Sequence, residues 1–471
     1  MSTDLAAFSR RQFFRSALGF PALAAAAVTN PLAPRKPHFP GPAKNVIFLF
    51  MHGGPSHLET FDPKPELNRL HGKPVPASFG RVQLQFSKFE EQPIIGCRRT
   101  FARHGQAGIE VSDLFPHTAK HADKLAIVRS MYHDGFTHTA ALNFLNNGWP
   151  RLGRPSLGSW VVYGLGSEGE SLPAFVVLLE GGIKCGPPAY SSGFLPAVYQ
   201  GATLRNGPAP ILNLRPPPGM TPPQQRDLLD GLRWFNERHA AEHPEVSALE
   251  ARIASYELAF RMQAAAPELA DLSRESEATR RLYGLHQEAT ADFGGRCLMA
   301  RRLVERGVRF VQVWSGSTTG GGDWDGHKHC DENHRKMAAK TDQPIAALLA
   351  DLATRGLLDS TLVIWGGEFG RTPTSDGGLN GGGDPEGRDH NPYGFSIWMA
   401  GGGVDGGRVI GRTDEIGLRA IDDRVHVHDL HATILALLGL DHTRLTYPFQ
   451  GRDFRLTDVH GDTALLGKLR A

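Results

Sequence analysis

Three continuous apolar runs, each followed by a polar loop, constrain the fold of this 471-residue chain more than any other feature. The runs cover residues 45–51, 308–314 and 360–365. An apolar run without alternation is typical of a parallel strand that is covered on both faces. Helical patterns separate the runs, and this alternation indicates an α/β fold with a mostly parallel central sheet. Loops at the carboxyl ends of such strands converge, so the sequence predicts a functional site at that edge.

Shorter patterns complete the outline of the fold. Further strands are predicted at 125–128, 174–178 and 395–400, and helices at 155–160, 344–352 and 429–438, the last one capped by Gly439. Residues 221–305 are predicted to be a mostly helical insertion, whereas the Gly- and Pro-rich residues 179–220 suggest no element. The Pro-rich residues 31–44 indicate a linker, and we expect a single domain over 45–460.

The N-terminus has the pattern of an export signal. Paired arginines and a phenylalanine in residues 9–13 precede a mild, Ala-rich apolar stretch at 17–28. This order predicts a twin-arginine signal peptide over residues 1–30, with cleavage between Ala24 and Asn30. We therefore expect a periplasmic or extracellular protein that engages the twin-arginine export machinery. No later stretch reaches about 18 apolar residues, so no membrane span is expected in the mature chain.

Charge and cysteine content narrow the choice of partner. The net charge is +2 without a basic run, which argues against nucleic acid. The four cysteines, Cys97, Cys185, Cys297 and Cys330, form no CxxC pair. Export permits disulfides, but the three possible full pairings remain open. Cys330 remains open as a metal ligand, a free thiol or a disulfide partner.

The segment after the run at 308–314 carries the clearest chemistry. Asp323, Asp325, His327 and His329 occupy alternate positions, and alternate side chains of an extended segment point the same way. Mixed oxygen and nitrogen ligands suit Zn²⁺, Mn²⁺ or Fe²⁺. The segment therefore predicts a metal site, and a metal site suggests hydrolysis.

Three loops (52–62, 323–334 and 366–371) and the cluster 388–390 supply the other candidates. Together they contain His52, Ser56, His57, Asp62, Asp323, Asp325, His327, His329, Glu368, Arg371, Asp389 and His390. That set is sufficient for one or two metals, a hydroxyl nucleophile and a cation that holds an anionic group.

Several candidates have a structural alternative. Ser56 is a nucleophile or only a helix N-cap. Glu368 is a metal ligand or the ion-pair partner of Arg371. Asp62 is a ligand, a support for one, or the start of a turn. His329 and His334 are expected at the surface, and His426 and His428 are expected as a hydrogen-bonded pair in a strand before a helix.

Four long stretches resemble a family of exported bacterial proteins that is catalogued as a domain of unknown function, number fifteen-hundred-and-one. They are MHGGPSHLETFDPKP (51–65), GGDWDGH (321–327), TLVIWGGEFGRTP (361–373) and GRDHNPYGFSIWMAGGGVDGGRVIG (387–411). The resemblance covers about residues 40–460. The family in turn looks like a branch of the alkaline phosphatase and sulfatase superfamily, which implies a three-layer α/β sandwich.

The resemblance also implies roles for residues. Asp325 and His327 match the superfamily's first-metal pair, and His390 completes it. Glu368 and His52 fall near positions where a second metal is bound, but Phe369 replaces the histidine expected there. The formylglycine signature Cys-x-Pro-x-Arg is absent, which argues against a formylglycine-dependent sulfatase.

The sequence therefore favours an exported metal-dependent hydrolase of phosphate or sulfate esters, including esters of carbohydrates. The divalent metal is expected to be zinc, manganese or calcium. Ser56 or a water would attack, and Arg371 would neutralise developing charge. Two alternatives stay open: a non-catalytic relative that binds polysaccharide, metal or an exported partner, and a metal-dependent mutase or transferase.

Overall fold

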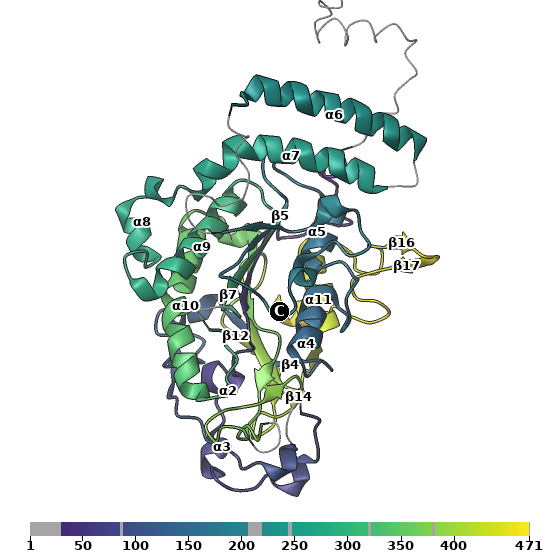
Figure 1. Cartoon of the computed structure of the whole chain (residues 1–471). Helices are drawn as coiled ribbons and strands as arrows, with labels where there is room; N and C mark the ends of the chain where they lie inside the picture. Colours follow the sequence, from purple (N-terminus) through teal and green to yellow (C-terminus); the bar gives the residue numbers. More distant parts are fainter. Residues whose placement is uncertain are drawn as a thin grey trace, which may run out of the picture.

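A nine-stranded sheet forms the centre of the molecule (Figure 1). The computed structural model describes residues 30–84, 88–205, 219–243, 247–318, 322–378 and 382–470. The signal peptide predicted over 1–30 therefore lies outside the described residues, apart from Asn30. The strand order is β12 (Arg408–Ile410), β4 (Ala126–Tyr132), β11 (Phe395–Ala400), β8 (Thr361–Gly366), β1 (Asn45–Met51), β7 (Phe310–Ser315), β5 (Phe175–Leu178) and β6 (Ala202–Leu204), and β15 (Val425–His426) also pairs with β4.

The sheet is mostly parallel, as the apolar runs predict. Strand β1 lies between β7 and β8 and is parallel to both, so that Phe48 is in register with Gln312 and Ile364. Among the described strands of this nine-stranded sheet, β11 is the exception, because it runs antiparallel to both β4 and β8. All residues of β1, β7 and β8 are buried. A central strand covered on both faces explains why these runs do not alternate between apolar and polar residues.

Helices cover both faces of the sheet and complete three layers (Figure 1). One face carries α9 (Glu288–Glu305), α10 (Cys330–Thr354) and η3 (Thr118–Lys124), and the other carries α4 (His138–Asn147), α5 (Leu157–Leu165) and α11 (Val427–Leu437). Alternate residues of β1 contribute to the two cores: Phe48 and Phe50 pack with α5 and α11, whereas Ile47 and Leu49 pack with α9 and α10. The mixed α/β architecture predicted from the sequence is confirmed.

Helices occupy most of the described part of residues 221–305. They are α6 (Pro222–Glu242), α7 (Ser247–Ala270), η6 (Leu272–Arg274), α8 (Glu277–Leu282) and α9. Helices α6 and α7 lie side by side at one end of the molecule, with α7 between α6 and the sheet (Figure 1). The C-terminal half of α7 is anchored by buried Met262, Ala266 and Leu269.

Short elements connect these layers. The short helices and 3-10 turns are α2 (His57–Thr60), α3 (Pro65–Arg69), η1 (Ala77–Phe79), η2 (Phe89–Glu91), η4 (Pro187–Tyr190), η5 (Ala197–Tyr199), η7 (Leu358–Ser360) and α12 (Ala464–Leu469). The small two-stranded sheets pair β2 (Phe101–His104) with β3 (Ile109–Ser112), β9 (Gly370–Arg371) with β10 (His390–Asn391), β13 (Arg412–Thr413) with β14 (Ala420–Asp422), and β16 (Tyr447–Phe449) with β17 (Arg452–Phe454).

Three local predictions are corrected by the structure. Helix α10 starts at Cys330 and continues through Pro344, where the sequence had suggested its first turn. His334 is completely buried inside α10 instead of exposed, because its Nε2 accepts the backbone N–H of Ser56 at 2.7 Å. His428 belongs to α11 and not to a strand, since β15 ends at His426.

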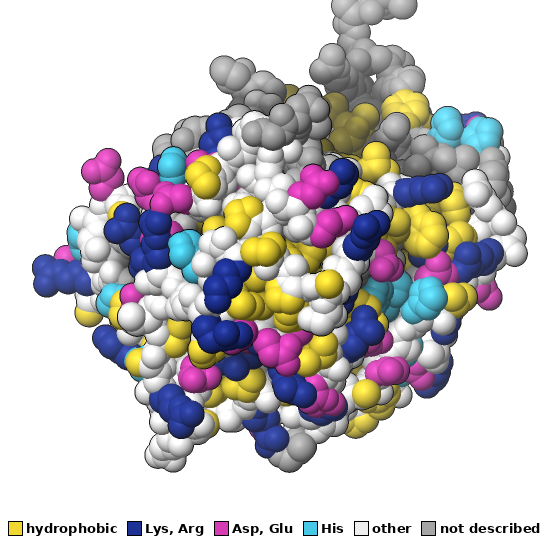
Figure 2. All heavy atoms as spheres, turned by 90° about the horizontal axis from the view of Figure 1, so that it is seen from below, with side chains coloured by type: hydrophobic (Ala, Val, Ile, Leu, Met, Phe, Trp, Pro, Cys, Tyr) yellow, Lys and Arg dark blue, Asp and Glu magenta, His cyan; other side chains and the backbone are white. Residues whose placement is uncertain are grey.

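Surface charges are mixed, and the cysteines are unpaired. Lys and Arg side chains are interspersed with Asp and Glu over the face shown in Figure 2. All four cysteines are free. Within the described residues, none of the helices combines the length and the apolar character needed to cross a lipid bilayer.

A buried histidine in α11 makes stability depend on pH. His431 is completely buried and its Nε2–H donates to the Leu145 carbonyl at 2.9 Å. Burial lowers its pKa to about 3, whereas an unfolded chain has a histidine pKa of about 6.5. Between these values the unfolded chain binds a proton that the folded chain does not. The free energy of unfolding therefore falls as the pH falls below about 6.5, by about 1.4 kcal/mol per pH unit for this histidine.

We expect His431→Gln to reduce this pH dependence. The glutamine amide preserves a donor for Leu145 but does not titrate. Denaturant unfolding at several pH values between about 6 and 4 should give a slope shallower than wild type by about 1.4 kcal/mol per pH unit. Parallel slopes for the two proteins would contradict this account of His431.

Candidate metal centre

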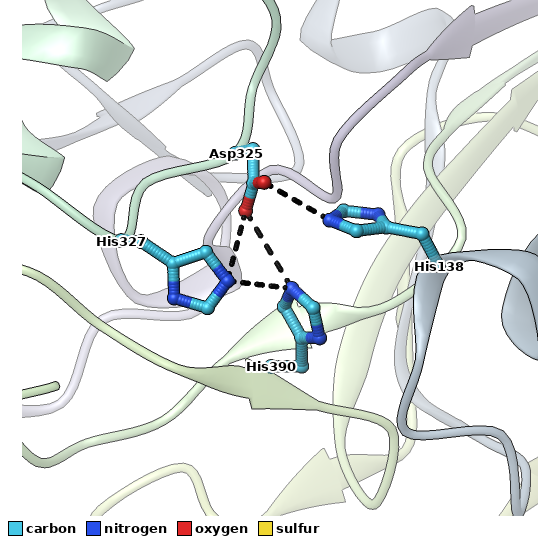
Figure 3. Close-up of side chains that lie close together, drawn as sticks. All are labelled: His138, Asp325, His327 and His390. Atoms are coloured by element: carbon cyan, nitrogen blue, oxygen red, sulfur yellow. Dashed lines mark hydrogen bonds and ion pairs between the residues drawn. The ribbon is translucent and has the colours of Figure 1, made fainter. Parts of the chain in front are cut away.

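The candidate site lies beyond the carboxyl ends of the central strands. Asp325 and His327 belong to the loop that follows β7, and His390 lies in β10, which pairs with β9 after β8. The first residue of α4, His138, reaches the same place from the loop after β4. One carboxylate oxygen or ring nitrogen from each of these four residues lies within 4.8 Å of the others (Figure 3). The convergence expected of parallel strands therefore brings together residues that are up to 252 positions apart in the sequence, from His138 to His390.

The centre of the group is a pair of facing imidazoles. Nε2 of His327 and Nε2 of His390 are 2.9 Å apart. The Asp325 Oδ1 lies 3.3 Å from the first of these nitrogens and 3.5 Å from the second (Figure 3). Three ligand atoms thus surround a space of the size that a transition metal ion occupies, since tetrahedral zinc places neighbouring nitrogens about 3.3 Å apart.

Each of the three histidines has its other ring nitrogen held by an oxygen. His138 Nδ1 lies 2.8 Å from Glu368 Oε1, His327 Nδ1 lies 2.8 Å from Asp376 Oδ2, and His390 Nδ1 lies 2.9 Å from the Phe136 carbonyl oxygen. A carbonyl or ionised carboxylate oxygen can only accept a hydrogen bond, so each Nδ1 is the donor. In a neutral ring, Nε2 then carries the lone pair, and this arrangement is typical of metal-ligating histidines.

The charge of Asp325 is stabilised from several sides. Burial alone would raise the pKa of Asp325, but Arg371 and the hydrogen bond from His138 hold the pKa well below its ordinary value. His138 Nε2 lies 3.0 Å from Asp325 Oδ2. Burial would lower the pKa of His138, but the hydrogen bonds to Asp325 and Glu368 raise it overall. A cation bound here would compete with a proton for Nε2 of His138.

A lysine completes the group. Lys184 comes from the loop after β5, and its Nζ lies 2.5 Å from Asp325 Oδ2, 3.1 Å from Asp323 Oδ2 and 2.9 Å from His138 Nε2. The side chain is 23% exposed, compared with 0% for Arg371. Lys184 is therefore the more accessible of the two cations that contact Asp325.

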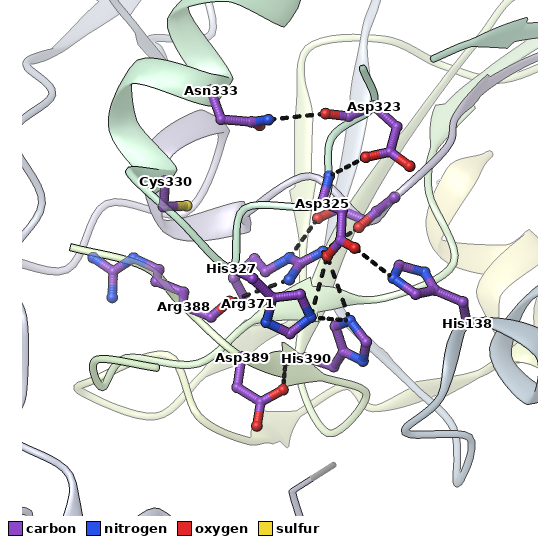
Figure 4. A network of polar contacts seen from close by, with 12 residues as sticks. His138, Asp323, Asp325, His327, Cys330, Asn333, Arg371, Arg388, Asp389 and His390 are labelled. Carbon is purple, nitrogen blue, oxygen red and sulfur yellow. Dashed lines mark hydrogen bonds and ion pairs between the residues drawn. The ribbon is translucent and has the colours of Figure 1, made fainter. Parts of the chain in front are cut away.

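Arg371 holds the loops of the site together. Its Nε donates to the Gly54 carbonyl at 3.0 Å, and its two terminal nitrogens donate to the Arg388 carbonyl at 3.1 Å, to the Gly53 carbonyl and to Asp325 Oδ1 at 2.6 Å (Figure 4). All three guanidinium nitrogens are therefore engaged inside the protein. This placement gives Arg371 a positioning role toward Asp325.

The two further metal candidates from the sequence lie beside the group and not within it. Glu368 is completely buried, and its carboxylate accepts the Gly53 N–H at 3.0 Å in addition to orienting His138. His52 Nε2 accepts the backbone N–H of Lys184 at 3.1 Å, while its Nδ1 lies 3.9 Å from Asp323 Oδ2. Burial lowers the pKa of His52, so this ring is held neutral.

Ser56, the proposed nucleophile, is completely buried at the N-cap of α2. Its backbone N–H donates to His334, and its side chain interacts with the buried carboxylate of Glu59. None of the contacts described for Ser56 reaches the four residues of the metal group.

The remaining candidates have structural partners. Asp62 accepts the Thr413 hydroxyl and pairs with Lys64, His57 contacts the Gly417 carbonyl, Asp389 accepts the His390 N–H, and the exposed His329 pairs with Glu386. His428 contacts the Gly148 carbonyl, and His426 caps α11 by accepting the His428 N–H. Phe369 stacks on His390 with ring centroids 4.2 Å apart.

Sequence reasoning missed three residues of the site. His138 follows a strand whose predicted end, at residue 128, lies before its observed end at Tyr132, so the loop after it was not recognised as part of the site. Lys184 lies in the Gly- and Pro-rich segment that suggested no element. Asp376 follows β9 in a loop without a recognisable pattern. Position after a parallel strand was the available signal for His138 and Lys184.

The protein is thus a mixed α/β protein with a histidine–carboxylate group at the carboxyl edge of its sheet. It belongs to the family described as "Protein of unknown function (DUF1501)", which matches residues 43–466. This match confirms the resemblance seen in the four sequence stretches. Curated protein sequences include no match to the chain.

The solved structures that match the chain share little sequence with it. The lipoteichoic acid synthase LtaP from Listeria monocytogenes is 8% identical, with 92% of this chain and 80% of that chain covered and a TM-score of 0.36. The PsFucS1 sulfatase from Pseudoalteromonas sp. is 13% identical (86% and 68% covered, TM-score 0.35). The alkaline phosphatase from the Antarctic bacterium TAB5 is 10% identical (85% and 99% covered, TM-score 0.37). Likeness at this level does not bear on the chemistry of the site.

We expect the carboxylate behind His327 to control metal affinity. Asp376→Asn leaves the four candidate ligands in place but weakens the acceptor that orients His327, which typically costs about 10- to 100-fold in affinity. Titration of the purified protein with Zn²⁺ or Mn²⁺, followed by calorimetry, measures this change. Asp384→Asn is the matched control, because Asp384 lies 3.6 Å from the exposed His329 instead. Equal affinities for the two variants would contradict the orienting role.

Proposed function

We propose that the protein is an exported metal-dependent hydrolase of phosphate or sulfate esters, with His138, His327, His390 and Asp325 as the metal ligands. The observation that carries the proposal is the convergence of three Nε2 atoms, each with its Nδ1 held by an oxygen, on one carboxylate. A divalent cation held there supplies Lewis acidity toward an ester oxygen or a water. The nitrogen-rich set favours zinc, manganese or iron over calcium, which prefers oxygen ligands.

The chain's own cations support an anionic substrate. Lys184 Nζ sits at the partly exposed side of Asp325 and is the group best placed to receive a phosphate or sulfate oxygen. Arg371 stays with Asp325 and the loop carbonyls, so its part is to hold the carboxylate in place. Because Ser56 is completely buried and has no described contact with the four ligands, water is the nucleophile that we favour.

The second candidate function is binding without turnover. Lys184 contacts both Asp323 and Asp325. Its ammonium group therefore already balances the carboxylate charge that a second metal ion would otherwise balance. Phe369 packs on His390 at the position where the family resemblance leads one to expect a further histidine. A protein with one metal and one ammonium group would bind an anionic ester firmly even if it did not cleave it.

Substitution of Lys184 tests the anion-binding role. We expect Lys184→Met to lower kcat/KM of the metal-loaded protein for aryl phosphates or sulfates by about 10- to 100-fold, since hydrogen bonds to charged groups contribute about 1.5–3 kcal/mol. Most of the change should appear in KM. Lys328→Met removes the same charge from an exposed neighbour of His327 and should change little.

One outcome would contradict the role of Lys184, and another would contradict the hydrolase. Activity that is equal in Lys184→Met and wild type would exclude the assigned role of the lysine. A metal-loaded protein that binds these esters but turns over none of them would instead support the binding protein.

Export is tested separately. The paired arginines at positions 10 and 11 motivate the assignment to the twin-arginine route. We expect the double substitution Arg10→Lys and Arg11→Lys to leave the uncleaved chain in the cytoplasm, whereas wild type reaches the periplasm or medium in shortened form. Cell fractionation followed by mass determination shows both. Unchanged export of the double variant would reject this route.

A further inference from the structure

Helix α6 presents an apolar stripe to solvent. Leu228 is 51% exposed, Leu232 is 38% exposed and Phe235 is 62% exposed. Their spacing of i, i+4 and i+7 places them on one face of the helix. Trp234, which is 50% exposed, packs its ring against Phe235 with centroids 4.9 Å apart. Single exposed apolar residues are ordinary, but four large ones on a single surface helix indicate an interaction surface.

The side of α6 that faces the protein is polar. Arg226 makes two hydrogen bonds with Glu257 of α7, at 3.0 and 2.7 Å, and Arg233 lies 2.9 Å from the same carboxylate. Arg226 also lies over the Phe260 ring. Two arginines of α6 thus point toward α7, while its large apolar side chains point to solvent. A partner on the outer face would remove these apolar side chains from water.

A glycine at the middle of the stripe adds an independent observation. Gly231 lies in the interior of α6, where glycine costs about 1 kcal/mol relative to alanine. A Cβ at this position would meet no atom within 4 Å. Packing within the described chain therefore does not require glycine here. A second helix that crosses close to the backbone at this point would require it.

Charges beside the stripe indicate what that second helix is. Asp227 and Arg238 are eleven residues apart, which is about three helical turns, so they lie on the same flank of α6. An antiparallel pairing of α6 with α6 of a second copy, with Leu228 of each opposite Phe235 of the other, brings each Asp227 within one turn of the opposite Arg238. The same twofold axis passes near Gly231. The surface is therefore complementary to itself in charge, in apolar content and at its point of closest approach.

We propose that α6 is a homodimer interface, in which the α6–α7 hairpins of two copies pack as an antiparallel four-helix arrangement. The pairing buries the stripe on both copies and forms two Asp227–Arg238 ion pairs at its rim. In Figure 1, α6 lies at one end of the described molecule with α7 beneath it, whereas α2, which follows β1 at the carboxyl edge of the sheet, lies toward the other end. The dimer therefore leaves both sites accessible, and this inference is independent of the proposed function.

The test is sedimentation equilibrium of the full chain over a dilution series. Wild type should be dimeric, and Phe235→Glu should be monomeric at the same concentrations. Leu152→Glu is the matched control, because Leu152 is also 62% exposed but lies outside α6, and it should stay dimeric. Gly231→Leu raises the helix propensity of α6 and yet should weaken the dimer. A weaker dimer in this variant could therefore not be explained by loss of folding.

The charge pair provides a second and sharper comparison. Asp227→Arg or Arg238→Asp alone places like charges opposite each other twice and should raise the dissociation constant about tenfold. The double variant Asp227→Arg, Arg238→Asp should restore the wild-type value. A monomeric wild type, a dimer that survives Phe235→Glu, or a double variant no better than the single ones would overturn the proposal. A monomer whose α6 binds phospholipid vesicles would assign the stripe to a membrane surface and would also overturn it.

Discussion

The candidate site depends on the hydrogen bond that each of its three histidines donates from Nδ1. Glu368, Asp376 and the Phe136 carbonyl fix the rings, so that the three Nε2 atoms point toward Asp325. Two imidazole nitrogens 2.9 Å apart repel each other if both carry lone pairs, and only a cation between them removes that repulsion. A proton can bridge two such nitrogens, but it does not engage Asp325 and His138, which pair with each other and with Arg371 and Lys184 instead. A divalent ion satisfies all four groups at once, and that is the physical basis for the proposed metal.

Buried arginines keep this arrangement in place. Arg371 ties Asp325 to the carbonyls of Gly53 and Gly54, which follow β1. Arg388 is also completely buried, and it pairs with Glu59 at 2.8 Å. Burial would raise the pKa of Glu59, but Arg388 lowers it overall, so the pair is ionic. An unpaired buried charge is strongly destabilising. The two arginines therefore fix the loops after β1 and β8 in a single relative position.

The sequence predicted the sheet well because its signal is local. Residues 45–51 form β1 as predicted, and β7 and β8 differ from the predicted runs by one or two residues at their ends. The proximity of Asp325 and His327 followed from the same reasoning, which also included His390 among the candidates, and the resemblance to a family assigned His390 to the same metal. His138 and Lys184 were missed because their role depends on which strand lies beside which. Strand β4 is reached only through the antiparallel β11, and no local pattern reveals that order.

The same limit explains the residues that were placed differently. Glu368 and His52 follow the right strands, but side-chain direction decides that one orients His138 and the other accepts a backbone N–H. His334 is a polar residue of a kind that is usually expected at the surface. Only the packing of α10 against the Ser56 loop shows that it is buried. Loop proximity was therefore predictable from sequence, whereas the division between ligands and supporting residues required the structure.

Anomalous diffraction from crystals grown with Zn²⁺ or Mn²⁺ tests the central claim most directly. The account predicts one strong peak about 2.0–2.2 Å from Nε2 of His138, His327 and His390 and from an Asp325 carboxylate oxygen. Lys184 Nζ should then lie beside the ion without ligating it. Crystals that show no peak among these side chains, or a peak that excludes both His327 and His390, would contradict the account.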